Sequence, residues 1–62
     1  MKINFVLTLK SGEERTVPCD VPQVPRVGEY VRLAGVRYTV ESVHWYPLSG
    51  TEVVAALWLL EQ

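Results

Sequence analysis

The sequence predicts an all-β protein, a small and strongly bent antiparallel barrel of five strands. Apolar and polar residues alternate from Gly28 to Trp45 on both sides of Gly35, which is typical of two short strands joined by a tight turn. A strand pair is marginal alone and requires more sheet around it. The chain has 62 residues, of which 48% are hydrophobic. This length gives a single domain, residues 1–62, and this composition excludes disorder.

The first predicted strand covers residues 3–10. Its odd positions are apolar and its even positions mostly polar, so we expect the odd side chains to face the core: Ile3, Phe5, Leu7 and Leu9. Ser11-Gly12 is a turn signal, and residues 15–17 then form a returning strand. Pro18 cannot donate a ladder hydrogen bond, so this strand lies at a sheet edge or ends there.

Three prolines divide the next segment, residues 18–27. Each proline favours an extended conformation for the residue before it. We therefore expect a fixed, extended loop with some apolar anchoring, and no domain boundary.

The strongest strand signals follow. Residues 29–33 form a strand with Val31 and Leu33 inward, Ala34-Gly35 is the turn, and residues 36–46 form a long strand. On this long strand Tyr38 and Val40 have one parity, whereas Val43 and Trp45 have the other. A β-bulge near Glu41-Ser42 would return all four to one face and bend the strand, as a small barrel requires. Tyr38 and Trp45 are accordingly expected in the core.

Residues 47–51 read as a turn, and residues 52–61 have two readings. Their alanines and leucines favour a helix, and Ser49 to Glu52 fits a capping box. A helix here would be apolar all round, however, in a domain too small to bury it. We favour a strand whose inward residues are Val53, Ala55, Leu57 and Leu59.

Composition and motifs narrow the classes of function. The net charge is −1, with one cysteine and one histidine. Cys19 and His44 have no neighbour in sequence that could activate them, and no phosphate-binding or nucleophile motif occurs. We therefore expect a protein that is not an enzyme and uses neither metal nor cofactor. A free thiol and the lack of a signal-peptide core or a membrane-spanning run predict a cytoplasmic protein that does not enter the membrane.

The last strand should also be apolar on its outer face, which is unusual because a strand buried on one side normally alternates with polar residues. Exposed apolar patches often mark interfaces, and tryptophan is enriched in their centres. Either the loop 18–27 covers this face or another molecule does. We expect a second copy or another protein to dock on Val6, Val54, Ala56, Trp58 and Leu60.

A second hypothesis is binding of single-stranded nucleic acid, which small barrels perform by stacking bases on aromatic side chains within a basic groove. Arginines alternate here with aromatic residues, although Glu29 and Glu41 dilute the charge. The net charge of the chain also gives no general attraction to phosphate. The candidate residues are Arg26, Tyr30, Arg32, Arg37, His44 and Tyr46.

The pattern from residue 25 onward resembles short SH3-like barrel proteins encoded in bacterial and prophage genomes. In these a Pro-x-x-Gly-Glu/Asp-x-Val entry precedes a turn and a Tyr-x-Val-x-x-Val strand. The corresponding residues here are Pro25 to Val31, Gly35, Tyr38 to Val40 and Val43 to Trp45. The resemblance implies an SH3-like barrel with a non-enzymatic binding or assembly role in the cytosol. Peptide-binding SH3 domains are a poorer match, because their acidic loop and paired aromatic motif are missing.

Overall fold

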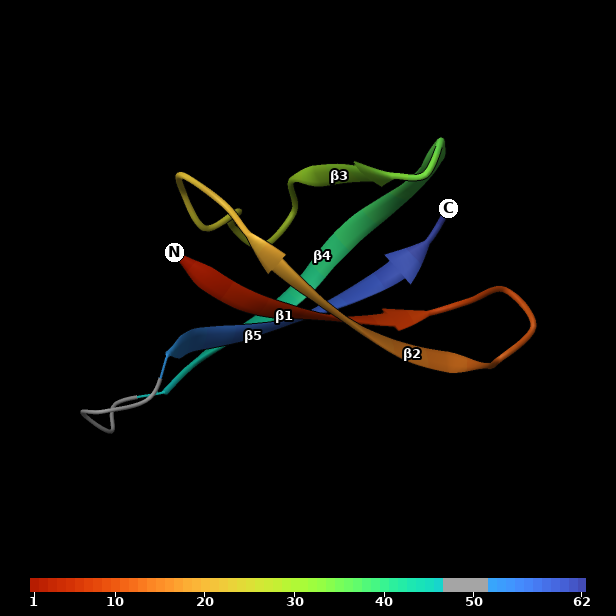
Figure 1. Ribbon diagram of the computed structural model, residues 1–62. Coiled ribbons are helices and arrows are strands. Elements are labelled where there is room, and N and C mark those ends of the chain that lie inside the picture. The colour runs from red at the N-terminus through yellow and green to blue at the C-terminus, as the bar shows by residue number, and fades with distance from the viewer. Residues whose placement is uncertain (47–51) are drawn as a thin grey trace.

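The computed structural model, which describes residues 1–46 and 52–62, is built entirely of strands and connecting segments (Figure 1). The predicted turn at residues 47–51 lies outside the described residues. The five strands are β1 (Lys2–Thr8), β2 (Glu14–Asp20), β3 (Tyr30–Leu33), β4 (Val36–Trp45) and β5 (Val53–Glu61). The all-β prediction is therefore confirmed, and the ambiguous last segment is a strand rather than a helix.

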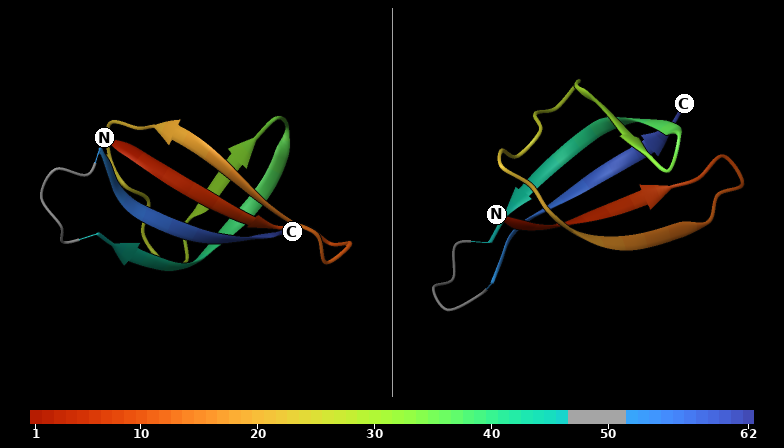
Figure 2. Two further views of the ribbon diagram at one scale, coloured as in Figure 1. Left: turned by 60° about the horizontal axis from the view of Figure 1, so that its bottom comes forward. Right: turned by 45° about the horizontal axis from the view of Figure 1, so that its top comes forward.

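All five strands belong to one sheet in the order β2-β1-β5-β4-β3. The sheet curls into a half-barrel with β2 and β3 at its two ends (Figure 2). Three of the strand pairs are antiparallel, but β1 and β5 run parallel. The expectation of a wholly antiparallel sheet is wrong for this central pair, since no short turn joins these two strands and local sequence does not fix their relative direction.

The core lies on the inner, concave face of the sheet. Phe5 of β1, Leu57 and Leu59 of β5 and Val40 of β4 are almost completely buried there. These are the parities that the alternating patterns predicted, except at two positions. Leu9 is only half-buried, and the register shift at the start of β5 places Val54 rather than Val53 against the inner cluster. Period-two patterning thus placed the inner face correctly, and burial of these side chains is the main stabilising term of the fold.

Strand β4 carries the predicted bulge. Val40 pairs with Leu59 and Ser42 with Trp58, so Glu41 is the extra residue. The extra residue changes the parity of the strand, and Val43 consequently packs against the same cluster as Tyr38. Trp45, which we expected in the core, is 61% exposed, because β3 pairs only with the first half of β4 and leaves this end of the strand beside a hollow.

Backbone conformation explains the β3–β4 turn and the position of the proline in β2. Ala34 and Gly35 both have positive φ values, 51° and 80°, as the two central residues of a type I′ hairpin require. Strand β2 continues through Pro18, because the proline lies on an edge strand where its missing N–H breaks no ladder bond. The prediction of an edge is confirmed.

The proline-rich loop crosses the open side of the half-barrel. Val21 and Val24 pack against the inner cluster, and the loop is tied to β4 by the N–H of Gly28, which donates to the carbonyl of Val40 at 2.9 Å. The loop therefore closes the concave side of the sheet. It does not cover the outer, convex face.

Candidate interaction surface

The outer face of β5 is the first candidate surface, and the register of the sheet fixes its neighbours. Trp58 lies beside Val6 of β1 on one side and Ser42 of β4 on the other. Leu60 lies between Thr8 and Thr39. Because directly paired residues point to the same side of a sheet, these side chains form one continuous surface. We call the group Val6, Trp58 and Leu60 the outer patch. Val54, which we expected on the same face, is the extra residue where the register between β1 and β5 shifts, and it packs against the inner cluster. The expectation that it faces outward is therefore wrong.

The exposure of the outer patch is graded. Trp58 is 36% exposed and Leu60 is 40% exposed, whereas Val6 is half-buried. Trp58 contacts His44 edge-to-face, with their ring centroids 4.7 Å apart. This contact fixes the indole against the sheet, so part of its ring system is covered by the chain itself and part remains accessible.

Ala56 does not belong to the accessible surface. It is only 2% exposed, and its neighbours in the sheet are Asn4 on β1 and His44 on β4. A methyl group between two longer side chains is easily covered by them, which alternation alone does not reveal. The expectation that Ala56 is accessible on the outer face is therefore wrong.

The loop 18–27 leaves the outer patch uncovered. Its two anchoring valines, Val21 and Val24, pack on the inner cluster, on the opposite side of the sheet. Of the two alternatives that the sequence left open, coverage of the outer face by this loop is thus excluded. An apolar patch on the central strand of the sheet remains solvent-accessible in the described chain.

The basic and aromatic candidates are only partly brought together. Tyr30 and Arg32 on β3 share the outer face with Arg37 on β4, and the guanidinium carbon of Arg37 lies 4.5 Å above the Tyr30 ring centre. Arg32 lies directly opposite Arg37 in the ladder. This cluster of Tyr30, Arg32 and Arg37 will be called the arginine corner.

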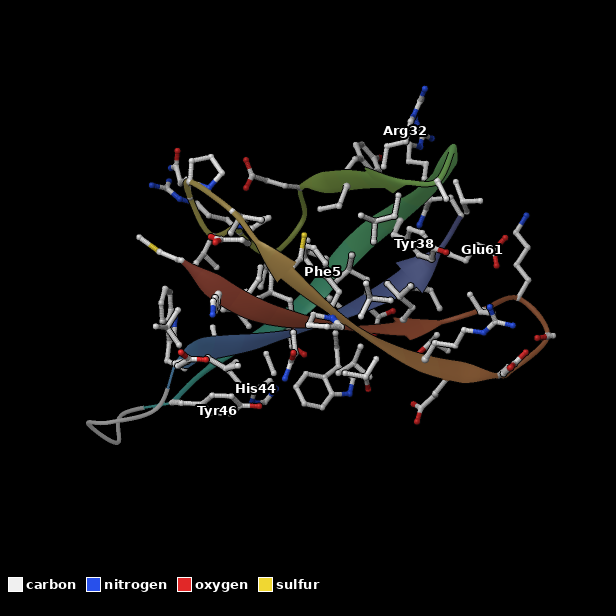
Figure 3. All side chains as sticks on the ribbon, viewed as in Figure 1. Phe5, Arg32, Tyr38, His44, Tyr46 and Glu61 are labelled. Carbon is white, nitrogen blue, oxygen red and sulfur yellow. The ribbon has the colours of Figure 1, made fainter. Side chains whose placement is uncertain are left out.

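His44 and Tyr46 lie at the far end of β4 from the arginine corner (Figure 3). Arg26 is in the proline-rich loop, where it lines a hollow on the other side of the sheet. Six residues that the sequence suggested as one groove are thus divided among three places. Between the arginine corner and His44, the residues of β5 that lie beside β4 are Leu60 and Trp58. The outer patch therefore separates these two places.

Charge is distributed unevenly over the described residues. Three exposed ion pairs occur: the N-terminal ammonium with Asp20, Lys2 with Glu52, and Arg15 with Glu13. None of them involves the arginine corner, whose two guanidinium groups have no acidic partner within 4 Å among the described residues. The corner is therefore a local positive site on a chain with a net charge of −1.

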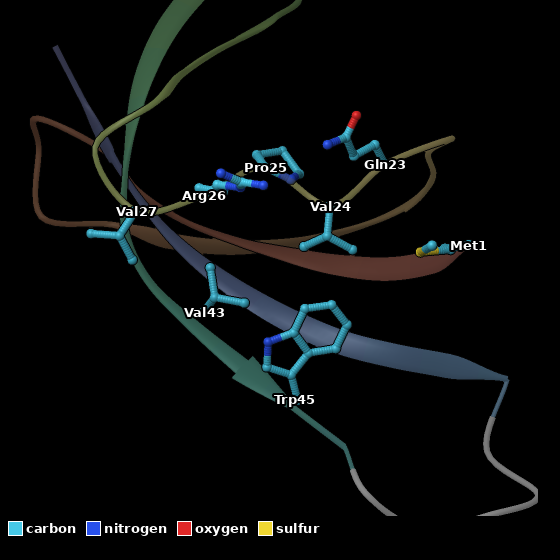
Figure 4. A pocket seen from close by; sticks show the side chains of 8 residues that line it. All are labelled: Met1, Gln23, Val24, Pro25, Arg26, Val27, Val43 and Trp45. Atoms are coloured by element: carbon cyan, nitrogen blue, oxygen red, sulfur yellow. The ribbon is translucent and has the colours of Figure 1, made fainter.

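A shallow hollow of about 410 Å³ lies between the proline-rich loop and the end of β4 (Figure 4). Val24, Val27, Val43 and Trp45 supply most of its apolar lining, with Arg26 at its edge. Sequence reasoning missed this hollow because it assigned Trp45 to the core. The signal that could have indicated the hollow was the set of apolar residues in the loop, which do not follow the period of two expected of a strand.

The part of the chain that the structure describes contains no group of three or more histidine, cysteine or acidic residues close enough to hold a metal ion. Cys19 is half-buried and packs against the inner cluster, as a small apolar residue would. Among the described residues no helix exists that could cross a membrane.

Comparisons of the chain with protein families, with curated proteins and with solved structures gave no match.

Proposed function

We propose that this protein is a small non-enzymatic interaction module that associates through the outer patch, with a second copy of itself or with another protein. The observation that supports this most directly is the exposed Trp58 on the central strand of the sheet, with Val6 and Leu60 around it. Aromatic residues in the middle of a patch supply much of the binding energy in protein interfaces. The short chain also gains from a partner, since a domain of this size buries only about 60% of its surface on folding.

The resemblance to SH3-like barrels of bacterial and prophage origin belongs to this proposal, together with its cytosolic location. It is supported by the strongly curled five-stranded sheet, the bulge at Glu41 and the tight turn at Gly35. The parallel pairing of β1 with β5 departs from the antiparallel barrel that the pattern implied.

The test is a comparison of two tryptophan variants. Trp58→Ala should weaken self-association by about 2 kcal/mol, or roughly thirtyfold in Kd. Trp45→Ala is the matched control, because Trp45 is more exposed than Trp58 but lies at the loop-lined hollow, away from the outer patch. Sedimentation equilibrium over a wide concentration range measures both.

Two outcomes would contradict the proposal in its self-association form. One is a wild-type protein that stays monomeric at every concentration, and the other is an equal loss of association in both variants. If the wild type is monomeric, the partner is another protein, and Trp58→Ala should then abolish its binding while Trp45→Ala leaves it intact.

The arginine corner favours single-stranded nucleic acid as a second candidate ligand. Tyr30 is 62% exposed and next to two unpaired guanidinium groups, which is the combination that stacks a base and holds a phosphate. We expect that a short oligonucleotide, if it binds, does so at low ionic strength and loses affinity steeply with salt, whereas apolar docking is barely affected. Fluorescence anisotropy with and without Arg37→Ala separates the two. A flat anisotropy curve up to high protein concentration would eliminate this candidate.

A further inference from the structure

The two ends of the half-barrel present unpaired strand edges, and the ladder pattern shows which backbone groups face outward. In an antiparallel pair, residues alternate between positions that bond to the partner strand and positions whose N–H and C=O groups point away from it. The carbonyl of Glu29 accepts a hydrogen bond from the N–H of Val40 at 2.9 Å, so Glu29 is a bonded position. The bonded positions of β3 are therefore odd, and Tyr30 and Arg32 direct their N–H and C=O groups to the free edge.

The same reasoning applies to β2. The N–H of Leu9 donates to the carbonyl of Glu13, and that of Val21 donates to the carbonyl of Met1, both at 2.8 Å. The even residues of β2 therefore face its free edge, and Pro18, which has no N–H, is one of them. Charged side chains on β2 further discourage pairing: Glu14, Arg15 and Asp20.

The β3 edge is less protected, since Arg32 is its only charged residue. It contains no proline and no bulge, and its main safeguard is its length of four residues. No backbone hydrogen bond outside the sheet involves Tyr30 or Arg32 among the described residues. This edge therefore offers two N–H donors and two carbonyl acceptors in a row to an incoming strand.

The side chains along β3 define what that strand must carry. Val31 and Leu33 point to the inner face and are only half-buried, so their neighbours on an added strand should be apolar. Tyr30 and Arg32 point to the outer face, where Arg37 completes the arginine corner. Acidic residues at these alternate positions would satisfy the two guanidinium groups that have no partner in the described chain.

Charge also argues against a second copy at this edge. If two β3 strands paired with each other, the arginine corners of both copies would meet, and four guanidinium groups would lie close together. Like charges opposite each other in a sheet are destabilising. An acidic strand avoids this repulsion.

We propose that the free edge of β3 is a binding site for an extended peptide segment of a partner protein, added antiparallel as a sixth strand, with alternating apolar and acidic residues. Addition of a strand to an exposed edge is an established mode of peptide recognition, in which backbone hydrogen bonds give affinity and alternate side chains give specificity. This site is separate from the outer patch on β5 and does not require it.

The test uses a fluorescein-labelled hexapeptide of alternating valine and glutamate, with anisotropy as the readout. The glutamates pair with Tyr30 and Arg32, so their N–H groups face β3. N-methylation of the glutamates should therefore abolish binding, whereas N-methylation of the valines should leave it nearly unchanged. A peptide of the same composition, with its three glutamates in one block, should bind at least fivefold more weakly. Equal effects of the two methylated peptides would overturn the proposal.

Variants of the protein test whether the peptide binds at the β3 edge. Arg32→Pro removes one outward N–H and one guanidinium group, and should weaken binding more than tenfold without breaking the β3–β4 ladder. Arg32→Glu keeps the N–H and should weaken binding of the glutamate peptide but strengthen that of its lysine counterpart. Thr16→Pro places the same substitution on the β2 edge and should leave binding unchanged. Unfolding curves verify that each variant is folded.

Three further results would refute the proposal. The first is an unchanged affinity in Arg32→Pro, and the second is a loss of affinity in Thr16→Pro alone. The third is self-assembly of the peptide-free protein that Arg32→Pro abolishes and Trp58→Ala does not, since a second copy would then occupy the edge. Because Trp58→Ala should bind the peptide like the wild type, failure of this proposal and failure of the outer patch are distinguishable.

Discussion

The two faces of strand β5 are both apolar, yet the fold uses only one of them. On the inner face Ala55, Leu57 and Leu59 are almost completely buried. On the outer face Trp58 and Leu60 are more than one-third exposed, although they alternate with the buried residues in the same strand. The amino-acid composition of the two faces is similar, and the difference lies in what covers them.

The inner face is covered because the sheet curls around it and the proline-rich loop closes the open side. The outer face is convex, so the side chains of neighbouring strands spread apart on it. Only the longer side chains cover the residues beside them. Ala56 is 2% exposed there, whereas Trp58 is 36% exposed. Curvature therefore decides which apolar residues stabilise the monomer and which are left for other contacts.

The largest effect should follow truncation of the inner face. Leu57→Ala removes a side chain that is fully buried between β1 and β4, and should lower the free energy of unfolding by about 2–5 kcal/mol. A domain of 62 residues has a total of roughly 3–9 kcal/mol, so this variant should lose a large share of its stability. Urea denaturation followed by tryptophan fluorescence measures the change.

Leu57→Val is the graded companion. Valine retains most of the apolar volume and is β-branched, which suits a strand, so this variant should lower the free energy of unfolding less than Leu57→Ala does. If neither variant changed the midpoint of unfolding, the inner face would not be the core of the fold. The difference between the two faces of β5 would then have no energetic meaning.

Local patterns predicted the inner face and the bulge because both depend on the period of two along a single strand. The parity change between Val40 and Val43 is visible in the sequence, and a bulge is the only local feature that reconciles it with one buried face. The turn at Ala34-Gly35 was equally accessible, since glycine tolerates the positive φ that this turn requires.

Contacts between distant segments were not predictable in the same way. The parallel pairing of β1 with β5 joins the two ends of the chain, and no turn residue sets its direction. The exposure of Trp45 and the burial of Ala56 depend on where neighbouring strands end and how long their side chains are. The candidate residues of the basic groove failed to meet for the same reason, because Arg26 is in a loop whose path the strand pattern does not specify.

The smallest effect on stability should follow a polar substitution on the outer face. Leu60→Thr introduces a β-branched side chain, which suits a strand, at a residue that is already 40% exposed. The free energy of unfolding of the monomer should therefore change by no more than about 0.5 kcal/mol. The same variant removes an apolar side chain from the outer patch and should weaken association. Urea denaturation at low protein concentration gives the first quantity, and sedimentation gives the second. A loss of stability as large as that of Leu57→Ala would mean that the outer face also belongs to the folding core, and Trp58 would then be a structural residue rather than an anchor for a partner.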